Sequence, residues 1–154
     1  MPMEIKMIAS NRRATHEYSI GEVFEAGMVL TGTEVKSART GKVNLSDGWV
    51  TISDAGEAFL QNTHISRYSH GSYMNHEESR PRKLLLKRKE LNKLAEKTQE
   101  KGLTIVPLKM YFHGQYVKIE IGVAKGKKLH DKRESAKSKE ADRDISRAMK
   151  HNRR

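Results

Sequence analysis

Apolar residues that recur at every second position predict β-strands in two parts of the chain. The pattern is clearest over 104–124, where alternate residues after a turn at 113–115 are apolar, namely Val117, Ile119, Ile121 and Val123. A second pair of apolar stretches lies within 49–65, on either side of the turn-forming residues 54–57. Both patterns are typical of β-hairpins, because a short polar turn joins two half-buried strands.

Two further segments in the first half of the chain have a regular pattern. Residues 16–31 carry apolar side chains at mostly even spacing, interrupted by two glycines, which predicts two strands with a bend between them. Thr33 can cap a short helix that runs to Thr40, and Gly41 follows where helices often need a left-handed residue. The polar residues 66–80 predict the longest loop.

A longer helix is expected over 82–101, with Pro81 near its first turn and Gly102 just past its end. One face of this helix would carry Leu84, Leu91, Leu94, Ala95 and Thr98. Leu85 and Leu86 would point away from that face. Either the beginning of the segment is extended, or these two side chains meet a second surface, and the pattern leaves both alternatives open.

These elements amount to about six strands and two helices in the first 120 or so residues. Strand-rich chains of this size close into small barrels to avoid exposed strand edges, and a barrel interrupted by helices suits the oligonucleotide-binding fold. We therefore expect a mainly β barrel domain over 1–124 with accompanying helices. Residues 125–154 contain only three large apolar side chains and no aromatic residue, so this tail is expected to be disordered alone.

Most of the excess charge of the chain lies in this tail. The 154 residues carry 30 Lys and Arg against 19 Asp and Glu, a net charge of +11, and residues 125–154 hold +7 of it. The tail also has an apolar stripe at helical spacing, which needs a partner surface, formed by Ala141, Ile145, Ala148 and Met149. We expect the tail to fold when it binds; a purely solubilising basic tail is the alternative.

The sequence contains no recognisable catalytic or metal site. Cysteine is absent, which excludes disulfides, thiolate metal ligands and a catalytic cysteine. Residues 122–128 are one residue short of a phosphate loop, and Lys128 occupies the place of the Ser or Thr that binds magnesium. The seven histidines are scattered, and no GxSxG motif is present. We expect no enzymatic activity, no metal and no cofactor.

Charge and composition point to a nucleic acid as the partner. No segment approaches the ~20 apolar residues that span a bilayer, and residues 1–8 lack the core of a signal peptide, so we expect a cytoplasmic protein without membrane contact. We also expect a monomer. The sequence pI is about 9.9, with basic clusters at 11–13, 80–83 and 87–89. Aromatic residues make up only 6% of the chain, which favours structured RNA recognised by shape over stacked single strands.

Four segments, in register over nearly the whole chain, resemble the small protein B family, the SsrA-binding (tmRNA-binding) proteins of bacterial trans-translation. They are NRRA at 11–14, FEAGMVLTGTEVKSARTGKVNLSDGWV at 24–50, RPRKLLLKRKEL at 80–91 and KIEIGVAKGKKLHDKR at 118–133. The resemblance implies a six-stranded barrel of the oligonucleotide-binding type and a C-terminal tail that is unstructured in the free protein.

The resemblance also implies a function, which is binding and not catalysis. Proteins of the family bind the tRNA-like domain of tmRNA and stand in for its missing anticodon arm. They deliver it, together with elongation factor Tu, to ribosomes stalled without a stop codon. The tail then enters the decoding region and the empty messenger channel as a helix. A generic basic ribosomal or RNA-chaperone protein is the alternative that the composition allows.

The family's RNA-binding residues fall on Asn11, Glu25, Leu85 and Lys118, and Arg12 and Arg13 belong to the same basic segment as the first. Lys118 lies opposite the apolar row of its strand, so it can reach phosphate, or it is an ordinary solvated lysine. Leu85 lies off the apolar face of the predicted helix, which suits a contact surface. Glu25 would accept from a base amine or a ribose hydroxyl, or hold a neighbouring arginine in place.

The family's ribosomal motifs fall on the tail. They comprise Gly126, Lys127, Lys128, His130, Asp131, Lys132 and Arg133, with Met149 further along as an apolar contact. The resemblance implies that the glycine lets the backbone turn out of the barrel and that the basic residues pair with ribosomal RNA phosphates. Asp131 would accept from a base or a ribose hydroxyl.

Overall fold

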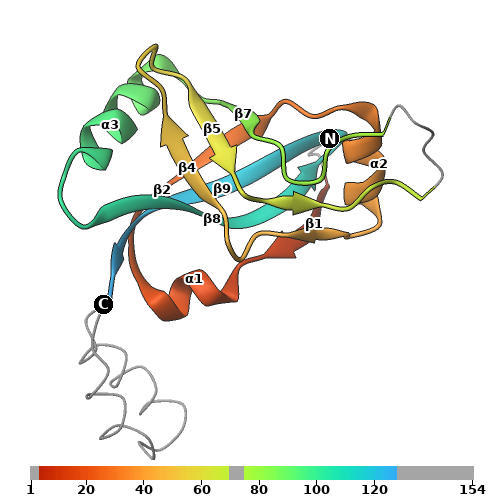
Figure 1. Ribbon diagram of the computed structural model, residues 1–154, viewed down its shortest axis with the longest axis horizontal. Coiled ribbons are helices and arrows are strands. Elements are labelled where there is room, and N and C mark those ends of the chain that lie inside the picture. The colour runs from red at the N-terminus through yellow and green to blue at the C-terminus, as the bar shows by residue number, and fades with distance from the viewer. Residues whose placement is uncertain (1–3, 70–74, 128–154) are drawn as a thin grey trace, which may run out of the picture.

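The protein is built around one large curved β-sheet with three helices at its periphery (Figure 1). The computed structural model describes residues 4–69 and 75–127. The strands are β1 (Ile5–Ser10), β2 (Tyr18–Met28), β3 (Val43–Asn44), β4 (Trp49–Ile52), β5 (Ala58–Gln61), β6 (His64–Ile65), β7 (Arg82–Leu85), β8 (Leu103–His113) and β9 (Tyr116–Gly126). The helices are α1 (Arg12–Glu17), α2 (Gly32–Arg39) and α3 (Arg88–Thr98).

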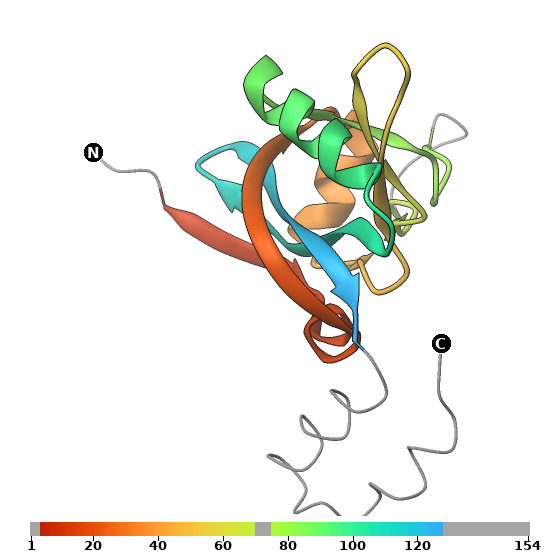
Figure 2. The same ribbon diagram turned by 90° about the vertical axis from the view of Figure 1, so that its left-hand side faces the viewer.

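Seven strands form one antiparallel sheet in the order β1-β8-β9-β2-β7-β5-β4, and β3 pairs with β6 in a separate two-stranded sheet. The large sheet curls, because β4 at one edge comes back to within 8 Å of β8 between Cα atoms. Figure 2 shows this curvature, with the long strand β2 bending around the body. The strands therefore enclose a core, as expected for a barrel.

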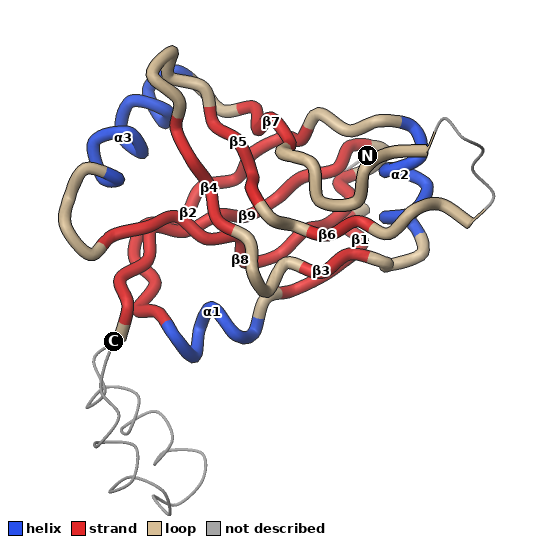
Figure 3. The backbone as a smooth tube through the Cα atoms, in the orientation of Figure 1, coloured by secondary structure: helices blue, strands red, loops and turns tan. Residues whose placement is uncertain are grey.

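The core is formed by the inward-facing side chains of the sheet. On β9 alternate residues from Val117 to Ile121 point inward, whereas on β8 an irregularity between Pro107 and Lys109 shifts the alternation. The fully buried residues of the two strands include Ile105, Met110, Ile119 and Ile121. Helix α3 covers one opening of the sheet with Leu91 and Leu94. A second, smaller cluster lies outside the sheet, where Ala14 of α1 packs on Val106 and Ala124. In Figure 3 the strands fill the centre and the helices lie around them.

Both predicted hairpins are confirmed. Strands β8 and β9 pair along their whole length, from Leu103 opposite Lys125 to His113 opposite Tyr116. Strands β4 and β5 pair around the predicted turn, where Gly56 has a φ of 82°. That value is in the left-handed region, which glycine adopts without a steric penalty.

The first part of the chain differs from its prediction in three ways. Residues 18–28 form one strand and not two, because β2 stays paired with β9 across an irregularity between Ile20 and Val23. Strand β1 and helix α1 were not predicted. Helix α2 is capped by Thr31 and not by Thr33, since the Thr31 side chain accepts from the Glu34 backbone in a capping box. The predicted glycine end is confirmed, with Gly41 at a φ of 75°.

The predicted helix over 82–101 is wrong in its first third. Residues 82–85 form strand β7, which lies between β2 and β5, and α3 begins only at Arg88. Leu84 is 2% exposed and Leu85 is 53% exposed, the alternation of a strand with one buried face. Of the two alternatives, the extended one is therefore correct. These residues form a strand despite their helix propensity, because β7 is hydrogen-bonded to the strands on both of its sides.

The mainly β fold with accompanying helices is confirmed, but the element count is not. Over residues 4–69 and 75–127 the structure has seven strands in the main sheet instead of six, and three helices instead of two. The expected domain boundary after Ala124 falls inside β9, which continues to Gly126. None of the helices in these ranges is long and apolar enough to cross a membrane.

Candidate nucleic-acid interface

Three strands place three of the expected RNA-binding residues around one groove. Strand β2 lies between β7 and β9, and Gly27 of β2 is opposite both Leu85 of β7 and Lys118 of β9. The groove has a volume of about 470 Å³ and is lined by Glu25, Gly27, Leu85, Leu86, Lys87, Glu90 and Lys118. Residues far apart in the sequence thus meet on the outer face of the sheet.

Gly27 gives this groove its floor. A Cβ atom at this position would lie 3.5 Å from the Leu85 Cβ and 3.9 Å from the Lys118 Nζ. Those are ordinary contact distances, so any side chain here would occupy the space between the two residues. Because Gly27 has none, the apolar surface of Leu85 and the ammonium group of Lys118 remain accessible from the same side.

Glu25 is exposed on the same face and is held by a buried tyrosine. The Tyr111 hydroxyl donates a hydrogen bond to the Glu25 Oε2, although Tyr111 is itself only 6% exposed. Burial raises the pKa of Tyr111, and the negative charge and hydrogen bond of Glu25 raise it further. The tyrosine therefore stays protonated and remains a donor. Of the two roles expected for Glu25, holding a neighbouring arginine is not observed among the described residues, where its side chain accepts from Tyr111.

The charge of the groove is balanced. Lys87 and Lys118 line it together with Glu25 and Glu90, and the Glu90 carboxylate accepts from the Lys87 backbone at the start of α3. A surface of this kind does not attract phosphate uniformly, since each carboxylate repels it. It offers acceptors and donors at fixed places, which favours selective contacts over non-specific ones.

Asn11 lies outside this groove and is 5% exposed. Its Nδ2 donates to the carbonyl oxygens of Leu45 at 3.3 Å and Pro107 at 2.8 Å, and its Oδ1 accepts from the backbone of Ala14. The side chain therefore caps α1 and ties it to β8 and to the segment before β4. In the structure it supports the fold and does not point to solvent.

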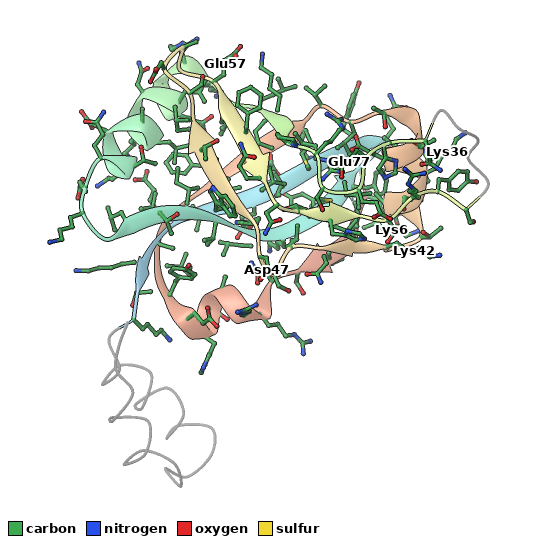
Figure 4. The ribbon with its side chains drawn as sticks, viewed as in Figure 1. Lys6, Lys36, Lys42, Asp47, Glu57 and Glu77 are labelled. Carbon is green, nitrogen blue, oxygen red and sulfur yellow. The ribbon has the colours of Figure 1, made fainter. Side chains whose placement is uncertain are left out.

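The two arginines after Asn11 are exposed but differ in their partners. Arg13 forms ion pairs with Glu17 at 3.0 Å and with Asp47 at 2.9 Å. Figure 4 shows Asp47 next to α1. Arg12 is exposed at the start of the same helix. Arg13 also lines a second depression of about 460 Å³ together with Asn11 and Trp49. The expected RNA-binding residues are therefore divided between two places.

The basic segment 80–83 is largely structural, which corrects its interpretation as a nucleic-acid surface. Arg82 is 0% exposed, and its guanidinium binds the Glu34 carboxylate and the Thr63 carbonyl. Arg80 donates to the same carboxylate at 2.6 Å. Lys83 pairs with Glu57, which Figure 4 shows at the tip of the β4–β5 hairpin. Most of this positive charge is therefore already neutralised within the protein.

Only the start of the tail belongs to the described residues. Gly126 is opposite Tyr18, and the Lys127 backbone donates to the Glu17 carbonyl at 3.0 Å, so the chain leaves β9 beside α1. A Cβ at Gly126 would meet nothing within 4 Å. The remaining tail residues of the sequence prediction lie outside the described part of the chain: Lys128, His130, Asp131, Lys132, Arg133 and Met149.

Sequence reasoning missed Tyr111, because its place beside the site depends on the register of the β8–β9 hairpin. In the β8–β9 hairpin Tyr111 is opposite Lys118, on the outward face. A correct register would have placed it beside the predicted site, but the alternation of Val117 and Ile119 gives the faces of β9 without its pairing. Within residues 4–69 and 75–127, no three His, Asp or Glu side chains gather as metal ligands.

Known proteins resemble this chain over nearly its full length. A family model described as SmpB protein matches residues 8–151. The SsrA-binding protein of Enterococcus faecalis is 56% identical over 151 residues, which cover 98% of this chain and 97% of that protein. The SsrA-binding protein of Syntrophotalea carbinolica is 57% identical over 148 residues, or 96% of this chain and 98% of that protein.

A solved structure supports the same assignment in three dimensions. It is described as "tmRNA-SmpB: a journey to the center of the bacterial ribosome", and it matches with a TM-score of 0.68 and 45% identity. The match covers 91% of this chain and 94% of that chain. Sequence and fold agree over the described barrel, and the chain belongs to the SmpB protein family.

Proposed function

We propose that this protein binds the tRNA-like domain of tmRNA and delivers it to stalled ribosomes for trans-translation, in a complex that includes elongation factor Tu. The observation that carries the proposal is the 56–57% identity, over nearly the full length of the chain, to proteins named SsrA-binding. The solved structure with a similar fold, named for tmRNA, SmpB and the bacterial ribosome, supports both RNA partners. The function is binding and positioning, not catalysis.

The groove on β2, β7 and β9 is the proposed tmRNA contact. Lys118 would neutralise a backbone phosphate, and the exposed side chain of Leu85 would pack on a ribose or a base. Glu25 would accept a hydrogen bond from the RNA. The balanced charge of the groove supports recognition of one RNA shape, because a uniformly basic surface would bind any folded RNA.

The residues around α1 have a different proposed role. Arg12 is exposed and would contact phosphate, and Arg13 could do so by exchanging its ion pairs with Glu17 and Asp47 for RNA contacts. Asn11 would act through the fold, since its side chain is fully used in holding α1 against β8. Loss of Asn11 would therefore misplace the neighbouring arginines.

The tail is the proposed ribosomal element. Gly126 and Lys127 mark the place where the chain leaves the barrel beside α1. Beyond them, the basic residues would pair with ribosomal RNA near the decoding region, and Met149 would supply an apolar contact in the messenger channel. The basic positions are Lys128, Lys132 and Arg133, with His130 between them, and Asp131 would accept from a base or a ribose hydroxyl. The body and the tail would thus serve two RNA partners.

Sequencing of the RNA that copurifies with the full chain tests the proposal. We expect one dominant species with a tRNA-like end. A broad mixture of folded RNAs would contradict the proposal and support the generic RNA-chaperone alternative. Because every RNA is a polyanion and its binding depends on salt, the comparison is made at the same salt concentration for all RNAs.

A truncation tests the division between body and tail. The chain should end after Lys127 and not after Ala124, since Lys125 and Gly126 still pair with β2. We expect this variant to keep its affinity for the tRNA-like domain within about threefold, because most contacts lie on the barrel. Tagging of nascent chains on stalled ribosomes should be lost. Loss of RNA affinity on truncation would contradict the division.

A further inference from the structure

Tyr111 connects three strands at the edge of the groove. It belongs to β8 and is opposite Lys118 of β9, whereas its hydroxyl reaches diagonally across β9 to Glu25 of β2. Glu120, the cross-strand neighbour of Glu25, is bound instead to Lys109 at 3.5 Å. Within the described residues, Tyr111 is the one hydrogen-bond donor to the Glu25 side chain.

This single bond leaves most of the acceptor capacity of Glu25 unused. A carboxylate has about four lone-pair positions on its two oxygens, and Tyr111 occupies one of them. Glu25 is exposed and lines the groove beside Lys118. The carboxylate is therefore held at one oxygen by a buried group, while the other oxygen remains available to a partner in the groove.

We propose that Tyr111 is a positioning residue, which fixes the Glu25 carboxylate so that it accepts a hydrogen bond from the RNA. The proposal rests on the proposed function and names the chemistry of that site. The donor would be a base amino or imino group or a ribose 2′-hydroxyl, because a phosphate has no proton to donate and is repelled by a carboxylate.

The benefit of the arrangement is preorganisation. A free glutamate at the surface loses side-chain freedom when it binds RNA, and this loss weakens binding by about twofold to tenfold. Tyr111 imposes that order before binding, because its own ring is buried in the outer face of the sheet.

The test uses the full chain and a transcript of the tRNA-like domain of tmRNA. Tyr111→Phe removes the hydroxyl but keeps the ring, and we expect about twofold to tenfold weaker binding with an unchanged melting temperature. Glu25→Ala should weaken binding about tenfold or more, since a hydrogen bond to a charged group is lost. The double variant should bind as Glu25→Ala alone, because Tyr111 acts only through Glu25.

Two further measurements separate positioning from a general structural effect. The salt dependence of binding should be the same for Tyr111→Phe and the unaltered protein, whereas Lys118→Ala should reduce the log–log slope by about 0.7–0.9. The same measurements use transcripts with inosine in place of guanosine, or with 2′-deoxy residues. At one position, the replacement should weaken binding by the unaltered protein. The same replacement should have a smaller effect on Tyr111→Phe and none on Glu25→Ala.

Several results would overturn the proposal. One is that Tyr111→Phe binds the RNA with the affinity of the unaltered protein. Another is that the affinity of the double variant falls by the product of the two single effects, since Tyr111 would then act independently of Glu25. If Tyr111→Phe folds poorly, Glu25→Asp replaces it in the test, because the shorter side chain keeps the charge but does not reach the tyrosine. Full RNA affinity of Glu25→Asp would likewise overturn the proposal. Equal binding of the unaltered protein to a control folded RNA contradicts the proposed function itself, and the role of Tyr111 falls with it.

Discussion

Glu25 on β2 and Glu34 on α2 are carboxylates in opposite environments. Glu34 is 0% exposed and accepts hydrogen bonds from Arg80 at 2.6 Å, from Arg82 at 2.8 Å and from the Thr31 backbone at 2.8 Å. Glu25 is exposed and accepts only the bond from Tyr111 among the residues the structure describes. One carboxylate is saturated with internal donors, and the other is held by a single donor.

The difference separates groups that stabilise the fold from groups that can bind a partner. Burial alone would raise the pKa of Glu34, but the hydrogen bonds from Arg80, Thr31 and Arg82 outweigh it, so that the pKa lies below its ordinary value. This carboxylate stays charged and has no capacity left for an outside ligand. A carboxylate with free lone pairs, such as Glu25, keeps that capacity.

Replacing Glu34 should produce the largest effect on stability. Glu34→Gln keeps the shape of the side chain but leaves Arg82, which is fully buried, without its counter-charge. We expect the free energy of unfolding to fall by about 3–5 kcal/mol, measured by urea denaturation. That is a large part of the ~5–15 kcal/mol typical of whole domains.

The matched control is Glu57→Gln. Glu57 also pairs with a cation, Lys83 at 2.9 Å, but both side chains are 43% exposed. An exposed pair contributes about 0–1 kcal/mol, so this variant should be nearly as stable as the unaltered protein. If the free energy of unfolding fell equally in the two variants, the buried ion pairs of Glu34 would stabilise the protein no more than an exposed pair does.

Acid should weaken the same cluster. The folded-state pKa of Glu34 lies below the ordinary value of 4.5 that the unfolded chain has, so the unfolded chain takes up the proton first as the pH falls. The contribution of Glu34 to stability is therefore complete above about pH 4.5 and is lost as the pH falls through the folded-state pKa.

The stability gap between the unaltered protein and Glu34→Gln reports this loss. We expect the gap to be constant from neutral pH to about pH 5 and to narrow as the pH falls toward 3, measured by urea denaturation at each pH. The other carboxylates titrate alike in both proteins and cancel in the difference. A gap that stays constant down to pH 3 would contradict the lowered pKa of Glu34.

Asn11 should behave like Glu34 and not like Glu25, although it is among the RNA-binding residues expected in the sequence analysis. Asn11→Ala removes the cap of α1 and two hydrogen bonds to buried carbonyls, at a cost of about 2–3 kcal/mol. Its exposed neighbour is the control, because Arg12→Ala should change stability by less than about 0.5 kcal/mol. A stable Asn11→Ala that has lost RNA affinity would place Asn11 in the RNA contact itself.

The comparison also explains what the sequence could predict. The β8–β9 hairpin and the outward face of Lys118 follow from local alternation and a turn, which neighbouring residues determine. Leu85 was recognised as unusual for a helix, and the reason is that it lies in a strand. Its neighbour Leu84, on the opposite face of the strand, is buried in the protein core. The position of Leu85 was thus a sign of a strand, but the helix-forming residues that follow it favoured a helix over the whole segment.

Contacts between distant residues could not be predicted in this way. Arg82 reaches Glu34 across 48 positions of the chain, and Tyr111 reaches Glu25 across 86. The basic segment 80–83 has the same composition whether its charges face RNA or a buried carboxylate. Only the pairing of β7 with β2 and β5, which turns Arg82 inward, decides between the two.

Glu25→Gln should have the smallest effect on stability and yet a clear effect on binding. The amide has nearly the same shape, and the site is exposed, so the free energy of unfolding should change by less than about 0.5 kcal/mol. Affinity for the tRNA-like domain should fall about threefold to tenfold, because the amide has one acceptor oxygen in place of two charged ones. Glu22→Gln is the control, since Glu22 is on the same strand but pairs with Lys93 outside the groove. If Glu25→Gln destabilises the protein as much as Glu34→Gln, the two carboxylates do the same work, and the distinction between a saturated and an available carboxylate fails.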